Sequence, residues 1–128
     1  MSTGQLLHLE KVSQDELGCW YSAARCFAFL SFAEGFGLPP IEAMQCDCPV
    51  LVSGIAAHRY SAGDAAIYCD PYNGGEIMAK LDFLTRDENR GEIDAMVARG
   101  RANAARFTIE QVLPLWEELF ARPPAGRT

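Results

Sequence analysis

Basic residues are scarce in this sequence. Its 128 residues include 11 Lys and Arg against 17 Asp and Glu, which gives a formal net charge of −6. Nucleic-acid binding depends on clustered basic side chains that neutralise phosphates, so this balance argues against a nucleic-acid partner. Long hydrophobic runs are lacking too, because no stretch approaches the roughly 20 residues that a membrane-spanning helix needs. The sequence therefore predicts no transmembrane segment.

The sequence also lacks an export signal and a disulfide framework. Its first residues hold only a short apolar run followed by charge, so we expect no signal peptide. The five cysteines are an odd number and several lie in apolar runs, which is typical of reduced thiols in a cytoplasmic protein. Cys46 and Cys48, with His58 nearby, match no zinc-binding spacing, so we expect no metal site.

What the sequence does contain is an ordinary globular composition, with 49% hydrophobic and 22% charged residues, at the length of one domain. Ser13 and Glu16 form a capping box that predicts a helix after Ser13. A polar loop is expected around His58 and Arg59. Short apolar runs predict a strand at residues 6–9 and buried strands at residues 27–30, 50–52 and 66–69.

The last third of the chain is predicted to be helical. Apolar residues recur there at helical spacing in three stripes, the last of which contains Pro114, either as a kink or in the first turn. Residues 122–128 hold two prolines and a glycine and predict a flexible tail beyond a domain at residues 1–121. The alternation of strands and helices predicts an α/β fold, with a parallel sheet, helices on both faces and a helical C-terminus. The stripes comprise Ile77, Met78, Leu81 and Leu84, then Ile93, Met96 and Val97, then Val112, Leu115, Trp116, Leu119 and Phe120.

The loop after strand 27–30 is the candidate site, because ligands of parallel sheets bind at the carboxyl ends of the strands. Gly35 and Gly37 allow close backbone approach, and a helix beginning near Pro39 directs its positive end into the loop. Glu34 at the strand end and Glu42 in the first helical turn could accept paired sugar hydroxyls. A structural interpretation stays open, in which Glu42 only complements the helix dipole, worth about 0.3–1 kcal/mol, and the glycines only shape a turn.

The string EGFGLPPIE, from Glu34 to Glu42, resembles the EX7E motif of family 4 (group 1) glycosyltransferases. The segments around it are similar to that family as well, over roughly residues 6–120, including Cys48-Pro-Val50 and Arg106-Phe-Thr108. The resemblance implies the C-terminal, nucleotide-sugar-binding domain of a GT-B enzyme in truncated form. The expected fold is thus part of a Rossmann-like domain.

The resemblance also implies a reaction and a set of site residues. In such enzymes a hexose passes from a nucleotide diphosphate sugar to an acceptor hydroxyl with retention at the anomeric carbon, without a metal or other cofactor. Glu34 would be the catalytic residue, supporting an oxocarbenium-like state electrostatically. The donor base, the hexose and the acceptor stay open. The residues that would bind the donor are Gly35, Phe36, Gly37, Leu38 and Glu42.

Parts of the family's active site have no counterpart in this sequence. The acceptor-binding domain is not present, nor are the first strands of the donor domain with the Arg and Lys that neutralise the diphosphate. Lys11, Arg25 and Arg59 are the remaining candidates for that role. We expect strand 27–30 to form an exposed sheet edge, covered by strand 6–9, by a second copy in a homo-oligomer, or by a complementing acceptor-domain subunit.

Five positions depart from the family's pattern, and three functions stay open. Asp47 stands where a glycine is usual and Tyr60 where a glutamate is usual; the others are Glu10, Arg25 and Ile109. The chain could be an enzyme module that another subunit completes. It could instead be a non-catalytic binding or oligomerisation module that keeps the donor loop as structure. The third possibility is an inactive fragment.

Overall fold

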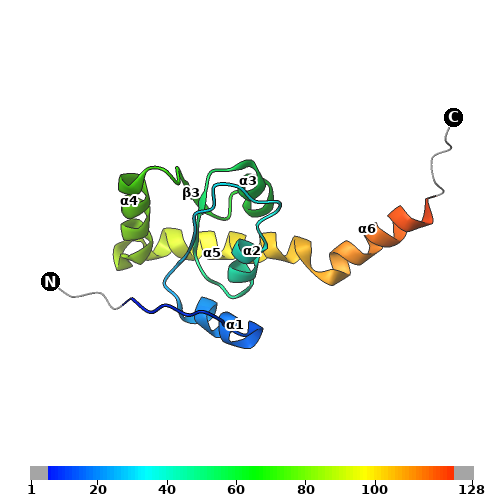
Figure 1. The fold of residues 1–128 in the computed structure, drawn as a ribbon, viewed down its shortest axis with the longest axis horizontal. Coiled ribbons are helices and arrows are strands. Elements are labelled where there is room, and N and C mark those ends of the chain that lie inside the picture. The colour runs from blue at the N-terminus through cyan, green and yellow to red at the C-terminus, as the bar shows by residue number, and fades with distance from the viewer. Residues whose placement is uncertain (1–5, 123–128) are drawn as a thin grey trace.

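Three short parallel strands form the sheet around which the chain is built (Figure 1). The computed structural model describes residues 6–122, so residues 123–128 of the predicted tail lie outside it. The helices are α1 (Gln14–Ala23), α2 (Leu38–Gln45), α3 (Ala56–Ala62), α4 (Gly74–Thr85), α5 (Arg90–Ala104) and α6 (Ile109–Ala121), with 3-10 turns at Asp87–Asn89 and Ala105–Phe107. The strands are β1 (Phe27–Phe29), β2 (Val50–Ser53) and β3 (Ile67–Cys69).

The central strand β2 is buried on both faces. It pairs in parallel with β1 and with β3, so that Leu51 lies opposite Ala28 on one side and Ile67 on the other. All four residues of β2 are buried, as the apolar run at residues 50–52 predicted. The predicted parallel α/β sheet with helices on both faces and a helical C-terminus is therefore confirmed.

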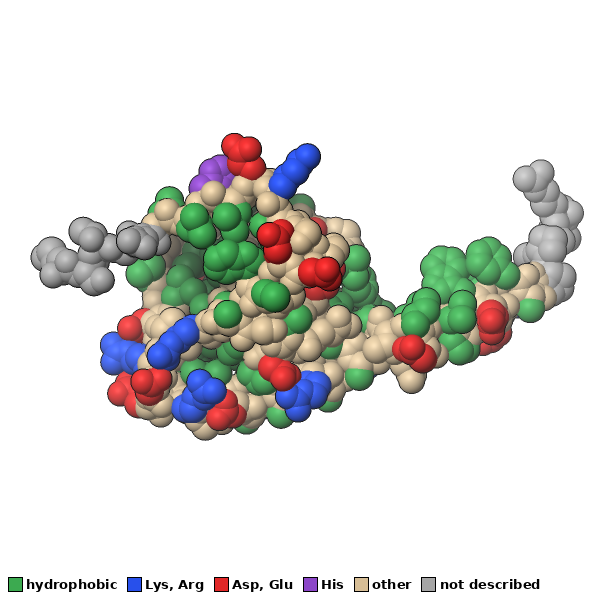
Figure 2. Space-filling view, turned by 90° about the horizontal axis from the view of Figure 1, so that it is seen from below, with side chains coloured by type: hydrophobic (Ala, Val, Ile, Leu, Met, Phe, Trp, Pro, Cys, Tyr) green, Lys and Arg blue, Asp and Glu red, His purple; other side chains and the backbone are tan. Residues whose placement is uncertain are grey.

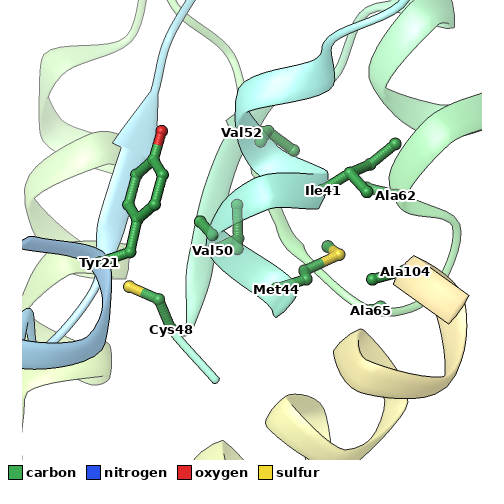
Figure 3. Packing of buried hydrophobic residues seen from close by; sticks show 10 residues of the cluster. Tyr21, Ile41, Met44, Cys48, Val50, Val52, Ala62, Ala65 and Ala104 are labelled. Atoms are coloured by element: carbon green, nitrogen blue, oxygen red, sulfur yellow. The ribbon is translucent and has the colours of Figure 1, made fainter. Parts of the chain in front are cut away.

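The first core lies between the sheet and α2. Val50 and Val52 point toward Ile41 and Met44 of α2, as Figure 3 shows. Helix α5 also packs closely on α2, because a Cβ added to Gly100 would lie only 3.2 Å from Cγ of Met44. This close approach places α2, and hence the loop that precedes it, against the tightly packed helix α5.

The second core covers the opposite face of the sheet. Leu51 points into it, since neighbouring side chains of a strand alternate between faces, and meets Leu84 of α4 and Met96 of α5. The predicted α4 stripe is confirmed except at Met78, which is 66% exposed.

The cysteines are not bridged. Burial raises the pKa of the Cys48 thiol, in the first core, to about 12. All five cysteines are free thiols.

Two predicted elements are wrong. Residues 6–9 form no strand: Leu6 is 96% exposed and Leu7 65%, and the segment pairs with none of the three strands that the structure describes. The polar segment around His58 is not a loop but helix α3. Its buried face consists of His58, Ser61 and Ala62, which are small or polar, so the apolar periodicity that marks a helix is missing from the sequence.

Helix α6 forms as predicted, but most of its apolar stripe is exposed: only Val112 is half-buried, while Leu115, Trp116, Leu119 and Phe120 are 52–78% exposed. It projects from the body, and apolar side chains gather along it (Figures 1 and 2). Phe120 is 78% exposed and stacks on Trp116 with ring centroids 5.7 Å apart. Pro114 lies inside the helix, beyond its first turn. No helix in this described part of the chain is both long and apolar enough to cross a membrane.

Asp47, in the turn after α2, adopts a left-handed backbone conformation with φ 58°. This explains why glycine suits the position, since residues with a Cβ rarely adopt positive φ. Asp47 also forms a bidentate ion pair with Arg101 of α5, at 2.9 and 2.7 Å. The hydrogen bond from Arg101 lowers the pKa of the Asp47 carboxyl. The ion pair therefore links the turn after α2 to α5. The left-handed backbone at this position would by itself favour glycine over aspartate.

We expect Asp47→Val to lower the free energy of unfolding by about 1–3 kcal/mol, because a β-branched residue tolerates the left-handed conformation poorly. Asp47→Gly should be nearly neutral: it relieves the backbone while losing a solvent-exposed ion pair worth about 0–1 kcal/mol. Urea unfolding of both variants measures the difference. Equal destabilisation would show that the ion pair, and not the backbone, sets the cost.

Candidate functional site

The loop from β1 to α2 lies at the carboxyl end of the sheet and carries Glu34. This glutamate is exposed, and its Oε1 accepts a hydrogen bond of 2.7 Å from the Ser31 hydroxyl at the start of the loop. The carboxylate is thus oriented by its own loop while remaining accessible to a ligand. This is the position that the sequence predicted for it.

Gly37 is the one loop residue whose identity the backbone dictates. It is the N-cap of α2, with φ 86°, and it is buried against α3. A Cβ at this position would lie 2.8 Å from Cδ2 of His58, closer than real contacts allow. Gly35, by contrast, is exposed with nothing within 4 Å of its hypothetical Cβ. Of the two predicted glycines, Gly37 allows α2 to pack closely on α3, and Gly35 leaves its backbone exposed to solvent.

Phe36 and Leu38, the other predicted contacts, have different surroundings. Phe36 is half-buried and packs edge-on against Phe107, with ring centroids 5.4 Å apart, and against Tyr60 at 6.0 Å. Its side chain therefore anchors the loop to the body, which leaves the backbone as the part available to a ligand. Leu38 is the first residue of α2 and is 56% exposed.

Glu42 lies in the second turn of α2, not in the first turn as predicted. The helix begins at Leu38, one residue before the two prolines, and its first turn contains no acidic residue. A favourable interaction with the helix dipole therefore does not account for Glu42, because that effect fades beyond the first turn.

Glu42 instead faces α1 across a groove of about 280 Å³, which Gln14, Leu17 and Tyr21 also line. Burial and then the nearby Glu42 carboxylate raise the pKa of Tyr21. Glu34 is not among the residues of this groove. The two glutamates thus have different surroundings, Glu42 in the groove beside α1 and Glu34 on the exposed loop.

A buried hydrogen-bond network beneath the loop was missed at the sequence level. The Ser53 hydroxyl, at the end of β2, donates to the Ser31 carbonyl. Nδ1 of His58 lies 2.9 Å from the Ser53 carbonyl. Since a carbonyl only accepts, Nδ1 carries the proton. The network joins the first residue of the loop to the α3 side chain on which Gly37 rests.

His58 itself is fully buried, and its Nε2 has no hydrogen-bond partner within residues 6–122. The same holds for the hydroxyl of Ser61, one turn further along α3. Both atoms lie beside Gly37: a Cβ on that residue would be 3.3 Å from Nε2 of His58 and 3.4 Å from the Ser61 hydroxyl. In the sequence, His58 stood out only as a neighbour of Cys46 and Cys48, because polarity by itself does not indicate a buried position.

Of the three cations considered for the diphosphate, only Arg59 lies beside the carboxyl ends of the strands. Its Nε donates to the Gly54 carbonyl directly after β2. Arg25 precedes β1, at the opposite end of the sheet, and is paired with Asp87 at 2.9 Å. Lys11 lies in the exposed segment before α1. Within residues 6–122, no three His, Cys, Asp or Glu side chains are grouped to hold a metal ion.

Comparison with known proteins identifies a family. The family "Glycosyl transferases group 1" matches residues 3–103. The chain is 38% identical over 107 residues to O-antigen chain mannosyltransferase B of Escherichia coli, covering 84% of this chain but only 28% of that protein. It is 30% identical over 122 residues to the serotype-specific mannosyltransferase WbdA of Escherichia coli, covering 95% of this chain and 15% of that protein.

A solved structure shares the fold. Sucrose-phosphate synthase from Thermosynechococcus elongatus superposes with a TM-score of 0.72 at 24% identity, over 88% of this chain and 30% of that one. The two structures therefore share the arrangement of their helices and strands over most of this chain. This chain thus corresponds to a minor part of each of these longer proteins.

We expect Gly37→Ala to destabilise the chain by about 1–3 kcal/mol, because alanine is strained at this φ and its methyl group would collide with His58. Gly35→Ala is the matched control and should change the free energy of unfolding by no more than about 0.5 kcal/mol. Thermal and urea unfolding measure both. Similar values for the two variants would mean that Gly37 does not rest on α3 as described.

Proposed function

The chain belongs to the glycosyl transferases group 1 family, and on that premise we propose that it binds a nucleotide diphosphate sugar. In this proposal it takes part in the retaining transfer of the hexose to an acceptor hydroxyl. The observation that supports it most is the construction of the loop from Ser31 to Leu38. Its backbone is anchored from below by the His58 network and by Phe36, while Glu34 and Gly35 are exposed above.

The proposed roles follow from these surroundings. Glu42, in the groove beside α1, would accept the two ribose hydroxyls, since a carboxylate offers two oxygens to paired donors. The backbone of Gly35, Phe36, Gly37 and Leu38 would contact the hexose and the diphosphate at the positive end of α2. Glu34, held by Ser31, would stabilise the positive charge that develops at the anomeric carbon. No metal or other cofactor is part of this proposal.

We further propose mannose as the hexose. The two Escherichia coli relatives described above are both named as mannosyltransferases. Specificity for a hexose comes from hydrogen bonds to its hydroxyls, and polar groups of the loop could supply them. The acceptor remains undefined by these relatives, because this chain covers only 28% and 15% of their lengths.

The transfer itself would need more than this chain. Catalysis by positioning requires an acceptor held against the donor. We propose that a complementing acceptor domain supplies that surface, together with the cations that neutralise the diphosphate. A non-catalytic binding module is the alternative that the following experiment would reveal.

Glu42→Ala should weaken binding of a nucleotide sugar at least roughly tenfold, because the ribose loses two charge-assisted hydrogen bonds worth about 1.5–3 kcal/mol each. The binding can be followed by amide NMR shifts during titration of the labelled chain with GDP-mannose and UDP-glucose. Glu117→Ala, an exposed substitution on α6, serves as the matched control and should leave the affinity unchanged. If neither nucleotide sugar shifts the loop amides of the unaltered chain, the donor-binding proposal fails.

The free edge of β1 supports a second proposal, about association. Among residues 6–122, β1 pairs only with β2, and the predicted covering strand at residues 6–9 does not form. Unpaired backbone groups on an edge strand are a template for another chain. We propose that this edge is covered by a second copy of the chain or by the complementing domain.

Ala28 is exposed on β1, so Ala28→Lys should discourage pairing along this edge without disturbing the core. We expect the unaltered chain to self-associate as its concentration rises, and the variant to do so less. Light scattering coupled to size-exclusion chromatography measures both masses. A monomer of the unaltered chain at every concentration would rule out a homo-oligomer through β1.

A further inference from the structure

A second pocket lies beside the paired-glutamate loop and, apart from Arg59, contains none of the predicted site residues. It has a volume of about 430 Å³ and is formed where all three strands end. Phe32 comes from the loop after β1, Gly54 directly follows β2, and Asp70 directly follows β3. Helices α3 and α4, on either side of β3 in Figure 1, flank it with Arg59 and Glu76. This is the sheet edge where ligands of parallel α/β folds bind.

An aromatic pair stands at this pocket. Phe32 is 62% exposed and Tyr72 is 81% exposed, and their ring centroids lie 4.7 Å apart at an interplanar angle of 34°. Neither side chain belongs to the two hydrophobic cores, so packing does not explain their presence. Aromatic rings offer a large, rigid apolar surface that loses little entropy on binding. A ligand with an apolar face of its own would cover such a pair.

The polar groups of the pocket are held in place by contacts within the protein, before any ligand binds. The Asp70 carboxylate accepts a hydrogen bond of 2.9 Å from the backbone N–H of Tyr72. The Glu76 carboxylate accepts one of 3.2 Å from the backbone N–H of Asp70. Arg59 is fixed by its bond to the Gly54 carbonyl and by stacking over Tyr68, 4.8 Å from the ring centroid. Each carboxylate has a further oxygen and the guanidinium further N–H groups with which to bind a ligand. The pocket thus combines fixed acceptors and a fixed donor beside an apolar surface.

The charges decide what kind of ligand fits. Two carboxylates face one guanidinium, so the pocket carries a net negative charge and would repel a phosphate or diphosphate. An uncharged ring with hydroxyl groups at its rim and C–H groups on its face suits these groups far better. A pyranose has this chemistry. The pocket therefore differs in character from the donor loop, which presents the positive end of α2.

We propose that this pocket is a saccharide subsite that binds a neutral pyranose ring of the glycan acceptor. The ring would stack on Phe32 and Tyr72, with its hydroxyls donating to Asp70 and Glu76 and accepting from Arg59. This inference rests on the proposed function, since an acceptor must approach the donor hexose beside Glu34. Phe32 lies two residues before Glu34 in the same loop, which makes the two sites neighbours.

The test is an amide NMR titration of the labelled chain with methyl α-mannopyranoside and an α-linked mannobiose, with glycerol as a control for non-specific hydroxyl effects. We expect saturable shifts at Gly54, Asp70 and Tyr72 with a dissociation constant on the order of 1 mM. Tyr72→Ala and Phe32→Ala should each weaken this binding roughly fivefold to tenfold, because each removes half of the stacking surface.

Phe120→Ala is the matched control, an equally exposed aromatic residue on α6, and should bind the saccharides like the unaltered chain. Tyr72 and Phe32 are exposed, so dispersed amide spectra should show that both variants remain folded. Shifts no larger than those with glycerol, or shifts that persist unchanged in both variants, would overturn the subsite.

Titration of the same samples with GDP-mannose separates this inference from the proposal on which it rests. Tyr72→Ala should retain nucleotide-sugar binding, and Glu42→Ala should retain saccharide binding. If the unaltered chain binds saccharides in a Tyr72-dependent way but no nucleotide sugar, the donor proposal falls and the subsite stands. If it binds the nucleotide sugar but no saccharide at this pocket, the subsite falls alone.

Discussion

The hydrogen bonds of Ser53 hold the candidate site to the core. Ser53 is the last residue of the buried strand β2; its hydroxyl donates to the Ser31 carbonyl and its own carbonyl accepts from His58. One residue thus links the start of the glutamate loop to the helix on which Gly37 rests. Because these groups are buried, leaving any of them unpaired would cost about 1–3 kcal/mol. The position of Glu34 and of the α2 N-terminus depends on this connection.

The two ends of the sheet carry different kinds of chemistry. The amino ends face exposed ion pairs such as Arg25 with Asp87 and Arg101 with Asp47, in which the charges neutralise one another. The carboxyl ends bear the loop with Glu34 and, beside it, the pocket with Phe32 and Tyr72. In a parallel sheet all strands end at the same edge, so residues from three separate loops meet there. That topology places the loop with Glu34 and the pocket with Phe32 and Tyr72 side by side.

Much of the architecture was predictable where local patterns are strong. The capping box of Ser13 and Glu16 starts α1 as expected, and the apolar run of β2 is buried throughout. Prediction failed where a partner outside the local segment decides the outcome. Residues 6–9 are apolar enough for a strand but pair with none of the three strands described. Helix α3 was missed because it buries His58 and Ser61 instead of large apolar residues.

The sequence by itself determined the family, the loop with its paired glutamates and the parallel α/β class, because each depends on the order and spacing of neighbouring residues. Only the tertiary structure decided that Glu42 faces α1 from the second turn of α2, and that His58 lies beneath Gly37. It alone showed that Asp47 keeps a left-handed backbone while paired with Arg101, 54 positions away. These features arise from contacts between residues distant in the chain, and such contacts exist only once the helices have packed on the sheet.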